Sequence, residues 1–253
     1  MRKGIMGGAR RIWLVGAAML VAAAVPVAAQ GTGNGYLFGV PDAELTIRGG
    51  WSLASANSAF FNQAQQDFTL SKSDFNSPTL GAALGIRLTP QLDFTLDGAW
   101  LGMSQGSHYR NFVDNNNQEI EQSTTLRRVP LTVNLKAFLA PRGRSVGSLA
   151  YIPSKVVPWI GVGAGATWYS LEQSGDFINT SSGAVYNDKF KDSGWGPAFQ
   201  GMGGVDVSLT PRMALTGDAR YLWSKATMGS DFQGYDKIDL SGVSLALGVT
   251  FRL

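Results

Sequence analysis

Apolar and polar residues alternate with a period of two through eight long stretches of the chain, and this pattern predicts β-strands. The stretches are residues 43–53, 79–88, 92–102, 127–139, 157–170, 198–209, 213–223 and 242–253. Each contains about 10 to 14 residues, whereas strands of soluble proteins usually contain about 5–6. A tilted strand needs about 9–11 residues to cross a bilayer. The pattern therefore predicts strands that span a membrane.

The two faces of these stretches differ sharply in charge. Apart from Arg127 and Arg128 at the start of the fourth stretch, the more apolar face carries no charged residue, and the opposite face carries five acidic and five basic residues: Glu44, Asp93, Asp97, Asp206, Asp218, Arg48, Arg87, Lys136, Arg220 and Arg252. A soluble barrel would turn its apolar face inward. A membrane barrel turns it outward, because a charge that faces lipid costs roughly 2–4 kcal/mol at the midplane. The equal numbers of acids and bases predict mutual pairing in a filled lumen, with a ligand or proton path as the alternative.

The connections between the stretches alternate in length. Thr89-Pro90-Gln91 and Thr210-Pro211-Arg212 are predicted to be tight turns, since proline presets one backbone angle. Long polar loops are predicted at 54–78, 103–126, 171–197 and 224–241. Short turns on one side and long loops on the other are typical of outer-membrane barrels. The connection 140–156 is an exception, because it is long although it belongs to the short-turn side.

Tryptophan ends the apolar face of every second stretch. Trp51, Trp100, Trp168 and Trp223 all fall at the same end of their predicted strands. Amphipathic rings favour the membrane–water interface, so this position predicts an aromatic girdle there. The alternative is four ordinary core tryptophans.

Residues 1–29 are predicted to be a cleaved signal peptide, which leaves residues 30–253 as one barrel domain. A basic segment precedes an apolar run from Ile12 to Val25, and small residues at 27–29 form a cleavage site. The run is too short to span a bilayer. Arg10-Arg11 permits a twin-arginine signal as an alternative, but we expect the general secretory route.

Charge and cysteine content exclude several classes of function. Four of the 21 basic residues lie in the first 29 positions, so the remainder carries 17 basic against 18 acidic residues. A basic surface for nucleic acid is therefore not expected. The chain has no cysteine, which excludes disulfides and thiolate metal sites.

The leader, the eight stretches, Val129–Lys136, Pro158–Gly165 and the last stretch resemble the small OmpA/OmpX/OmpW-type eight-stranded outer-membrane β-barrel proteins. The last stretch, in which Val243, Leu245, Leu247, Val249, Phe251 and Leu253 alternate up to the terminus, resembles the C-terminal strand that the barrel-assembly machinery recognises. The resemblance implies an all-β, eight-stranded antiparallel up-and-down transmembrane barrel in the bacterial outer membrane. It also implies that both termini are periplasmic and that the bilayer and lipopolysaccharide are partners.

Four patterns of candidate chemistry each have a simpler explanation. Gly161–Ala166 fits the dinucleotide fingerprint, but a strand follows it where the fingerprint needs a helix. His108, the single histidine, has Ser104 and Ser107 nearby, and we interpret it as a solvated loop residue. Asp93 and Asp97 share a face about 13 Å apart, too far for a carboxylate dyad. The segment 114–119 alternates oxygen ligands as calcium loops do, but lacks the glycine of the sharp turn. We therefore predict no catalytic, cofactor-binding or metal-binding residue.

The sequence favours a non-enzymatic protein with a structural or surface-interaction role through its extracellular loops, whose partners the sequence does not indicate. The alternative is passage of small apolar molecules, which the resemblance to the OmpW type suggests. A third hypothesis is an enzyme that modifies outer-membrane lipids, as some eight-stranded relatives do. The sequence lacks their His-x-Ser spacing at His108, so we rank it last.

Overall fold

Eight long strands form at the positions that the alternating pattern predicts. The computed structural model describes residues 35–253 except 115–116, 148–149, 180–183, 233 and 236, so the predicted signal peptide lies outside the described residues. The long strands are β2 (Ala43–Ala54), β3 (Ser77–Thr89), β4 (Leu92–Val113), β5 (Glu119–Phe138), β8 (Val156–Ile178), β9 (Val185–Ser208), β10 (Met213–Thr227) and β12 (Gly242–Arg252). The tight turns at 89–91 and around 210–212 lie where they were predicted.

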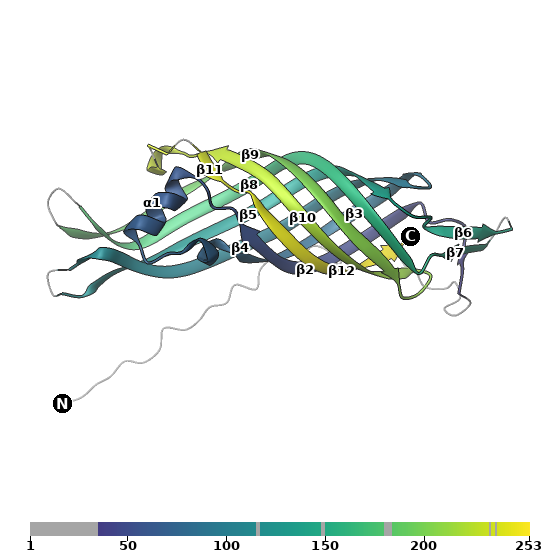
Figure 1. The fold of residues 1–253 in the computed structure, drawn as a ribbon. Coiled ribbons are helices and arrows are strands. Elements are labelled where there is room, and N and C mark those ends of the chain that lie inside the picture. The colour runs from purple at the N-terminus through teal and green to yellow at the C-terminus, as the bar shows by residue number, and fades with distance from the viewer. Residues whose placement is uncertain (1–34, 115–116, 148–149, 180–183, 233, 236) are drawn as a thin grey trace, which may run out of the picture. The chain divides into compact units, whose positions relative to one another are not determined.

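Each long strand pairs antiparallel with two others, and together they form a ring. The order is β2-β3-β4-β5-β8-β9-β10-β12, and β12 pairs back with β2. Figure 1 shows these strands tilted around a common axis. The pairing confirms the predicted eight-stranded antiparallel barrel, in which inter-strand bonds satisfy the backbone polar groups.

The side chains confirm that the apolar face points outward. Leu80, Val162 and Leu247 are 61–67% exposed on the outside of the ring. Inward positions hold buried polar residues such as Thr132 and Thr216. The lumen of this barrel is thus polar and its outer wall is apolar, as lipid requires.

The aromatic girdle is confirmed in part. Trp51, Trp100 and Trp223 are about half exposed on the outer wall. Trp168 is only partly exposed, and it pairs with Trp195, which is 59% exposed. Trp195 lies in a segment predicted to be a loop, so the pattern of stretches missed it.

Two of the predicted long loops are wrong. The segments 103–126 and 171–197 are mostly strand, because β4 and β5 pair as far as Val113 and Glu119, and β8 and β9 pair as far as Ile178 and Val185. These extensions need no alternation of apolar and polar residues, because water rather than lipid contacts their outer face. Backbone hydrogen bonds hold them without that pattern.

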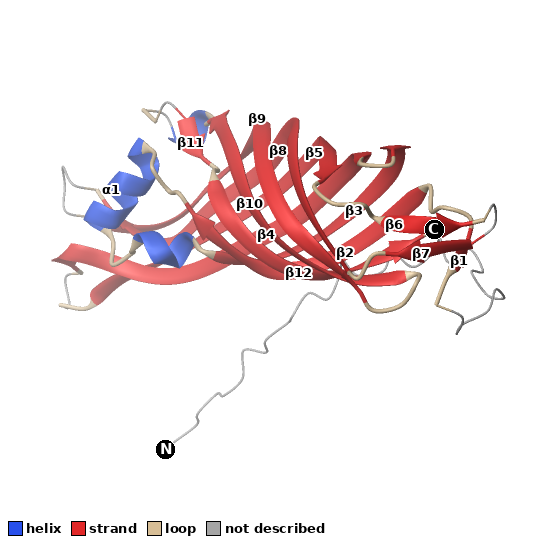
Figure 2. Ribbon diagram, turned by 45° about the vertical axis from the view of Figure 1, so that its right-hand side comes forward, coloured by secondary structure: helices blue, strands red, loops and turns tan. Residues whose placement is uncertain are grey.

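One end of the barrel carries a folded cover, and we call it the cap end. It comprises α1 (Ala59–Asp67), the short helices η1 (Lys72–Phe75) and η2 (Ser230–Phe232), the strand β11 (Lys237–Asp239), and the extended β4–β5 and β8–β9 hairpins. Figure 2 shows the helices gathered at this end. The connections 54–78 and 224–241 are therefore folded segments, and no helix within the described residues is long and apolar enough to cross a membrane.

We call the opposite end, with the tight turns and the C-terminus, the turn end (Figures 1 and 2). The long connection 140–156, to which the sequence assigned no structure, forms a hairpin of β6 (Gly143–Val146) and β7 (Ala150–Pro153) there. The short strand β1 (Leu37–Phe38) pairs with β7 and completes a three-stranded sheet. The chain before the first barrel strand and the irregular connection thus stabilise each other.

The outward position of Val133 can be tested with a charge. We expect Val133→Arg, about midway along the wall, to lower the free energy of unfolding by roughly 2–4 kcal/mol in lipid, because the arginine faces the bilayer core. Val113 is equally exposed but lies at the end of the β4 extension, so Val113→Arg should cost roughly 0–1 kcal/mol. Urea titration in lipid vesicles measures both, and equal losses would contradict the assignment of the outer wall.

Candidate functional site

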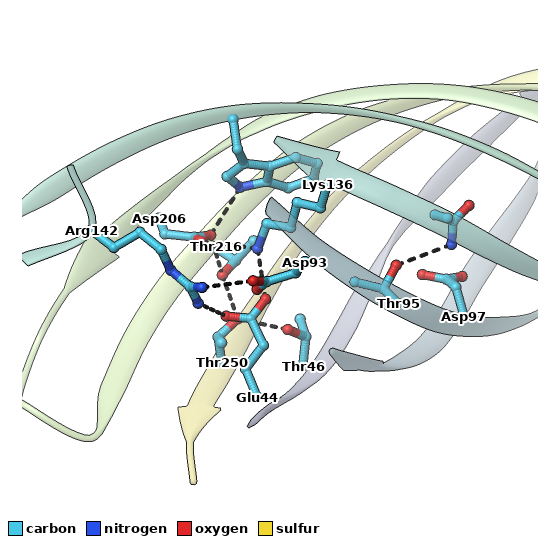
Figure 3. Close-up of polar contacts among 12 residues, drawn as sticks. Glu44, Thr46, Asp93, Thr95, Asp97, Lys136, Arg142, Asp206, Thr216 and Thr250 are labelled. Atoms are coloured by element: carbon cyan, nitrogen blue, oxygen red, sulfur yellow. Dashed lines mark hydrogen bonds and ion pairs between the residues drawn. The ribbon is translucent and has the colours of Figure 1, made fainter. Parts of the chain in front are cut away.

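The lumen holds a connected cluster of ion pairs near the turn end (Figure 3). Lys136 Nζ on β5 lies 2.9 Å from Glu44 Oε1 on β2 and 3.1 Å from Asp206 Oδ2 on β9. Arg142, from the connection after β5, lies 3.1 Å from Glu44 Oε2 and 2.7 Å from Asp93 Oδ1 on β4. Two cations thus join four strands across the lumen.

Aromatic rings and hydroxyls complete the surroundings of these charges. Lys136 Nζ lies 4.6 Å from the ring centre of Trp159 and 4.7 Å from that of Phe138. Trp159 Nε1–H donates to Asp206 Oδ1 at 3.0 Å, and the Thr216 hydroxyl donates to the same oxygen at 2.8 Å. Each carboxylate therefore has a hydrogen bond or an ion pair, which buried charges require.

A second cluster lies deeper in the barrel. Asp97 on β4 accepts from Arg48 Nη2 on β2 at 2.7 Å and from Arg220 Nη1 on β10 at 2.7 Å. Arg220 Nε also donates to Asp218 Oδ1 at 2.6 Å. β4 and β10 are four strands apart in either direction around the ring, so Arg220–Asp97 crosses the full width of the lumen.

The cavities that remain inside the lumen are small. Three of them, bounded by residues of the two ion-pair clusters, have volumes of about 10, 40 and 20 Å³. One water molecule needs a cavity of roughly 10–15 Å³. The spaces suit one or a few waters, and they are too small for a stream of hydrated ions.

At the cap end the lumen meets an apolar core. Buried residues of α1, η1, η2, β11 and the segments that join them pack together with inward residues of β5, β8 and β10: Ala56, Phe60, Phe61, Ala64, Phe68, Leu70, Phe75, Leu126, Tyr169, Leu171, Ala226, Met228, Phe232, Ile238 and Leu240. Arg128, which is buried directly beneath, donates to Leu240 O at 3.1 Å and so joins the lumen to this core. The cap end is therefore a packed structure.

Eight of the ten predicted lumen charges form ion pairs: seven pair with one another, and Asp93 pairs with Arg142, which was not among the ten. Arg87 and Arg252 are the exceptions: Arg87 donates to the Thr89 carbonyl, and Arg252 donates to the Pro211 carbonyl and the Ser208 hydroxyl. Both lie at strand ends on the turn end, where their side chains are only partly buried.

The sequence reasoning missed two buried cations, Arg128 and Arg142. Arg128 lies on the inward face of β5, so the alternation alone was enough to find it. Arg142 follows the barrel strand, and no periodic pattern predicts that it reaches Glu44 and Asp93.

The hypothesis of a lipid-modifying enzyme that uses His108 gains no geometric support. His108 lies within β4, so its assignment to a loop is wrong. Its Nδ1 lies 3.4 Å from Glu119 Oε2 and 3.5 Å from Thr69 Oγ1. Ser104 and Ser107 instead contact Thr125 and Gln122. The described side chains place no serine hydroxyl against the imidazole.

The other patterns have structural explanations. Gly161–Ala166 continues β8 as predicted, and a Cβ at Gly163 would collide with Asn134, so packing in the lumen requires this glycine. Asp93 and Asp97 belong to different ion-pair clusters. Part of 114–119 lies outside the described residues, and Asp114 Oδ1 accepts from the Gln118 backbone. Among the described residues, no three potential ligands are grouped to hold a metal.

A family of outer-membrane proteins matches most of this chain. The family model described as "Outer membrane protein beta-barrel domain" matches residues 15–251. OprG from Pseudomonas aeruginosa is 14% identical with a TM-score of 0.47, and 86% of this chain and 99% of that one are covered. Neisserial surface protein A is 14% identical with a TM-score of 0.42, with 83% and 96% covered. Outer membrane protein W of Escherichia coli is 16% identical with a TM-score of 0.38, with 84% and 99% covered. No curated protein matches.

The Asp97 bridge can be tested by removing its carboxylate. Asp97→Ala leaves Arg48 buried without a carboxylate partner, while Arg220 keeps Asp218. We expect the free energy of unfolding to fall by about 3–5 kcal/mol, because an unpaired buried charge is strongly unfavourable. Asp42→Ala, at an exposed site of the turn end, is the control. Urea titration in micelles, followed by tryptophan fluorescence, measures both, and similar small losses would refute the role of the bridge.

Proposed function

The chain belongs to the outer-membrane β-barrel protein family, and on that premise we propose that it is a non-enzymatic outer-membrane protein whose cap end faces outward and acts as an interaction surface. The observation that carries the proposal is the filled interior. Ion pairs occupy the lumen and an apolar core closes its cap end. Since the interior offers no open path, the surface of the cap end is the part left to act on the surroundings.

The proposed orientation has support from the lengths of the connections. Tight turns lie at one end, and the long hairpins and α1 lie at the other. In bacterial outer-membrane barrels the short turns are periplasmic and the long loops are extracellular. Both termini are then periplasmic, because the C-terminus lies at the turn end and the first barrel strand begins there.

Lipopolysaccharide is the proposed lipid partner at the cap end. Arg127 and Lys225 are exposed on the outer wall. Lys225 lies two residues beyond Trp223 on the same face, and Arg127 lies two residues from Val129, which pairs with Trp168. Cations just beyond the aromatic girdle suit anionic headgroups. The barrel-assembly machinery is the proposed partner of β12, whose apolar face supports this role.

Passage of small apolar molecules is the second candidate. The apolar core at the cap end favours it, since an apolar solute could partition there. The ion-pair clusters beneath oppose it, because an apolar solute would have to displace paired charges. Release of an apolar dye from liposomes distinguishes the two functions. If the protein acts only as an interaction surface, liposomes that contain it should release the dye no faster than liposomes without protein.

The filled lumen predicts little steady conductance in planar bilayers. Opening a path requires breaking Arg220–Asp97 or Lys136–Glu44, and each break leaves a buried charge unpaired. Asp97→Ala should raise the frequency of brief openings, whereas Asp42→Ala should not. A large, stable, ion-selective channel in the parent protein would show that the charges line a pore.

Cysteine labelling tests the orientation. The chain has no native cysteine, so single substitutions report without background. Gln105→Cys lies exposed on the β4 extension and Gln91→Cys lies exposed in a tight turn. On intact cells, we expect an impermeant maleimide to label Gln105→Cys, and to label Gln91→Cys only after the outer membrane is disrupted. Labelling of Gln91→Cys alone would invert the topology.

A further inference from the structure

A cavity of about 190 Å³ lies at the cap end, apart from the ion-pair clusters of the lumen. Three segments bound it: α1, the extended β8–β9 hairpin and the segment around η2. Six aromatic residues line it: Phe60, Phe68, Phe177, Phe190, Phe232 and Tyr235. An apolar cavity of about 150 Å³ accepts benzene, so this one has room for a small organic group.

The aromatic lining is held in place by contacts between its rings. Phe60 packs edge-to-face with Phe232 and with Tyr235, at centroid distances of 5.5 and 5.6 Å. Phe177 packs against Phe190 at 4.9 Å, and Phe190 contacts Phe232 at 6.4 Å. These contacts join the three segments, so the rings form a preorganised wall.

The η2 segment is also fixed from below. Asp192 Oδ2 on β9 accepts from the Gly229 N–H at 3.0 Å and lies 2.6 Å from the Tyr169 hydroxyl. Tyr169 is fully buried and its hydroxyl also lies 3.0 Å from the Thr227 carbonyl. These bonds anchor the chain that leads into Phe232 and Tyr235.

Two carboxylates, one at the end of α1 and one in η2, line the same cavity. Asp67 ends α1 and accepts from Gln63 Nε2 at 3.2 Å. Asp231, in η2, accepts from the backbone N–H of Lys191 at 3.2 Å. Among the side chains that the structure describes, neither carboxylate has a cationic partner within ion-pair distance, unlike the carboxylates of the lumen.

Tyr235 lines the same cavity and senses the charge of Asp67. Burial raises the pKa of its hydroxyl above the usual range, and the nearby Asp67 carboxylate raises it further. The phenol therefore stays neutral at physiological pH. Among the described residues that line the cavity, the negative charge comes from Asp67 and Asp231.

We propose that this cavity binds a small organic cation, such as an alkylammonium or quaternary ammonium group. Aromatic rings attract such cations through the negative charge of their faces. The two aspartates add attraction and repel anions. A purely apolar ligand would use the rings but would leave both carboxylates without a role. The inference goes beyond the proposed function, and it does not depend on which side of the membrane the cap end faces.

The experiment compares choline with its neutral analogue 3,3-dimethyl-1-butanol, which has the same shape without the charge. Each compound is titrated into the full-length refolded barrel in a non-ionic detergent, which has no charged headgroup that could compete for the site, and binding is followed by calorimetry. We expect choline to bind saturably and the alcohol to bind at least tenfold more weakly. Equal affinities would show an apolar site, and absence of choline binding up to millimolar concentrations would show that no cation site exists. Either result overturns the proposal.

Two variants test the two parts of the site separately. Asp67→Asn combined with Asp231→Asn should weaken choline binding about tenfold or more and leave the alcohol unchanged. The control, Glu121→Gln with Asp188→Asn, removes the same charge at exposed positions of the cap end that do not line the cavity, and should have little effect. If both double variants weakened choline binding equally, only the overall negative charge of the cap end would attract choline, and the proposed site would be refuted.

Phe190→Leu tests the aromatic part. It keeps an apolar side chain at a half-buried position but removes one ring. One cation–π contact changes affinity by roughly twofold to thirtyfold. Choline binding should therefore weaken by that factor, while binding of the alcohol should change little. A heat-dependent shift on unboiled gels confirms that each variant is folded. Unchanged choline binding in folded Phe190→Leu would contradict the aromatic contribution.

Discussion

Closure of the strand ring is the constraint on which the rest of this structure depends. β10 pairs with both β9 and β12, so the barrel has no free edge among its eight long strands. In a bilayer this closure is what satisfies the backbone. It also fixes the faces: lipid accepts only the apolar side, and every charged side chain of the spanning strands must turn inward. Eight strands leave an interior no wider than their own side chains. The charges are therefore forced together, and they must neutralise each other.

The pairing of those charges determines the mechanics of the barrel. Arg220–Asp97 joins two strands on opposite sides of the ring, and Lys136 joins β5 to both β2 and β9. Such pairs act as crossbars that hold the cross-section in one shape. Arg142 extends the network to the connection after β5, and its guanidinium also lies 4.1 Å from the ring centre of Phe138. The β6–β7 hairpin is thereby linked to the lumen, and the irregular connection becomes part of the barrel.

The sequence was sufficient to predict the parts of the molecule that the membrane constrains. The alternation predicted all eight strands and assigned Asp97 and Arg220 to the lumen. It does so because apolar side chains must face the lipid and charged side chains must face the narrow lumen. Outside the membrane that constraint ends. The extensions of β4 and β8, which include Ser107 and Gln173, are strands without an alternating pattern, and Arg142 reaches the lumen from a connection without periodicity. The folded cap depends on contacts between distant segments, such as Phe60 with Phe232, and no local pattern encodes them.

The interior is filled in two different ways, by paired charges in the spanning part and by an apolar core at the cap end. In the spanning part, charged side chains face inward and form ion pairs with one another. At the cap end, water surrounds the hairpins, so an ordinary apolar core forms there as in a soluble domain. The junction between these regimes is Arg128, whose bond to the Leu240 carbonyl ties the polar lumen to the apolar core. A ligand that entered the cap would meet this junction and then the Arg220–Asp97 crossbar. Passing further requires separating buried charges, at several kcal/mol for each pair. Binding at the cap end is thus energetically separate from transport through the barrel, and the fold favours the first.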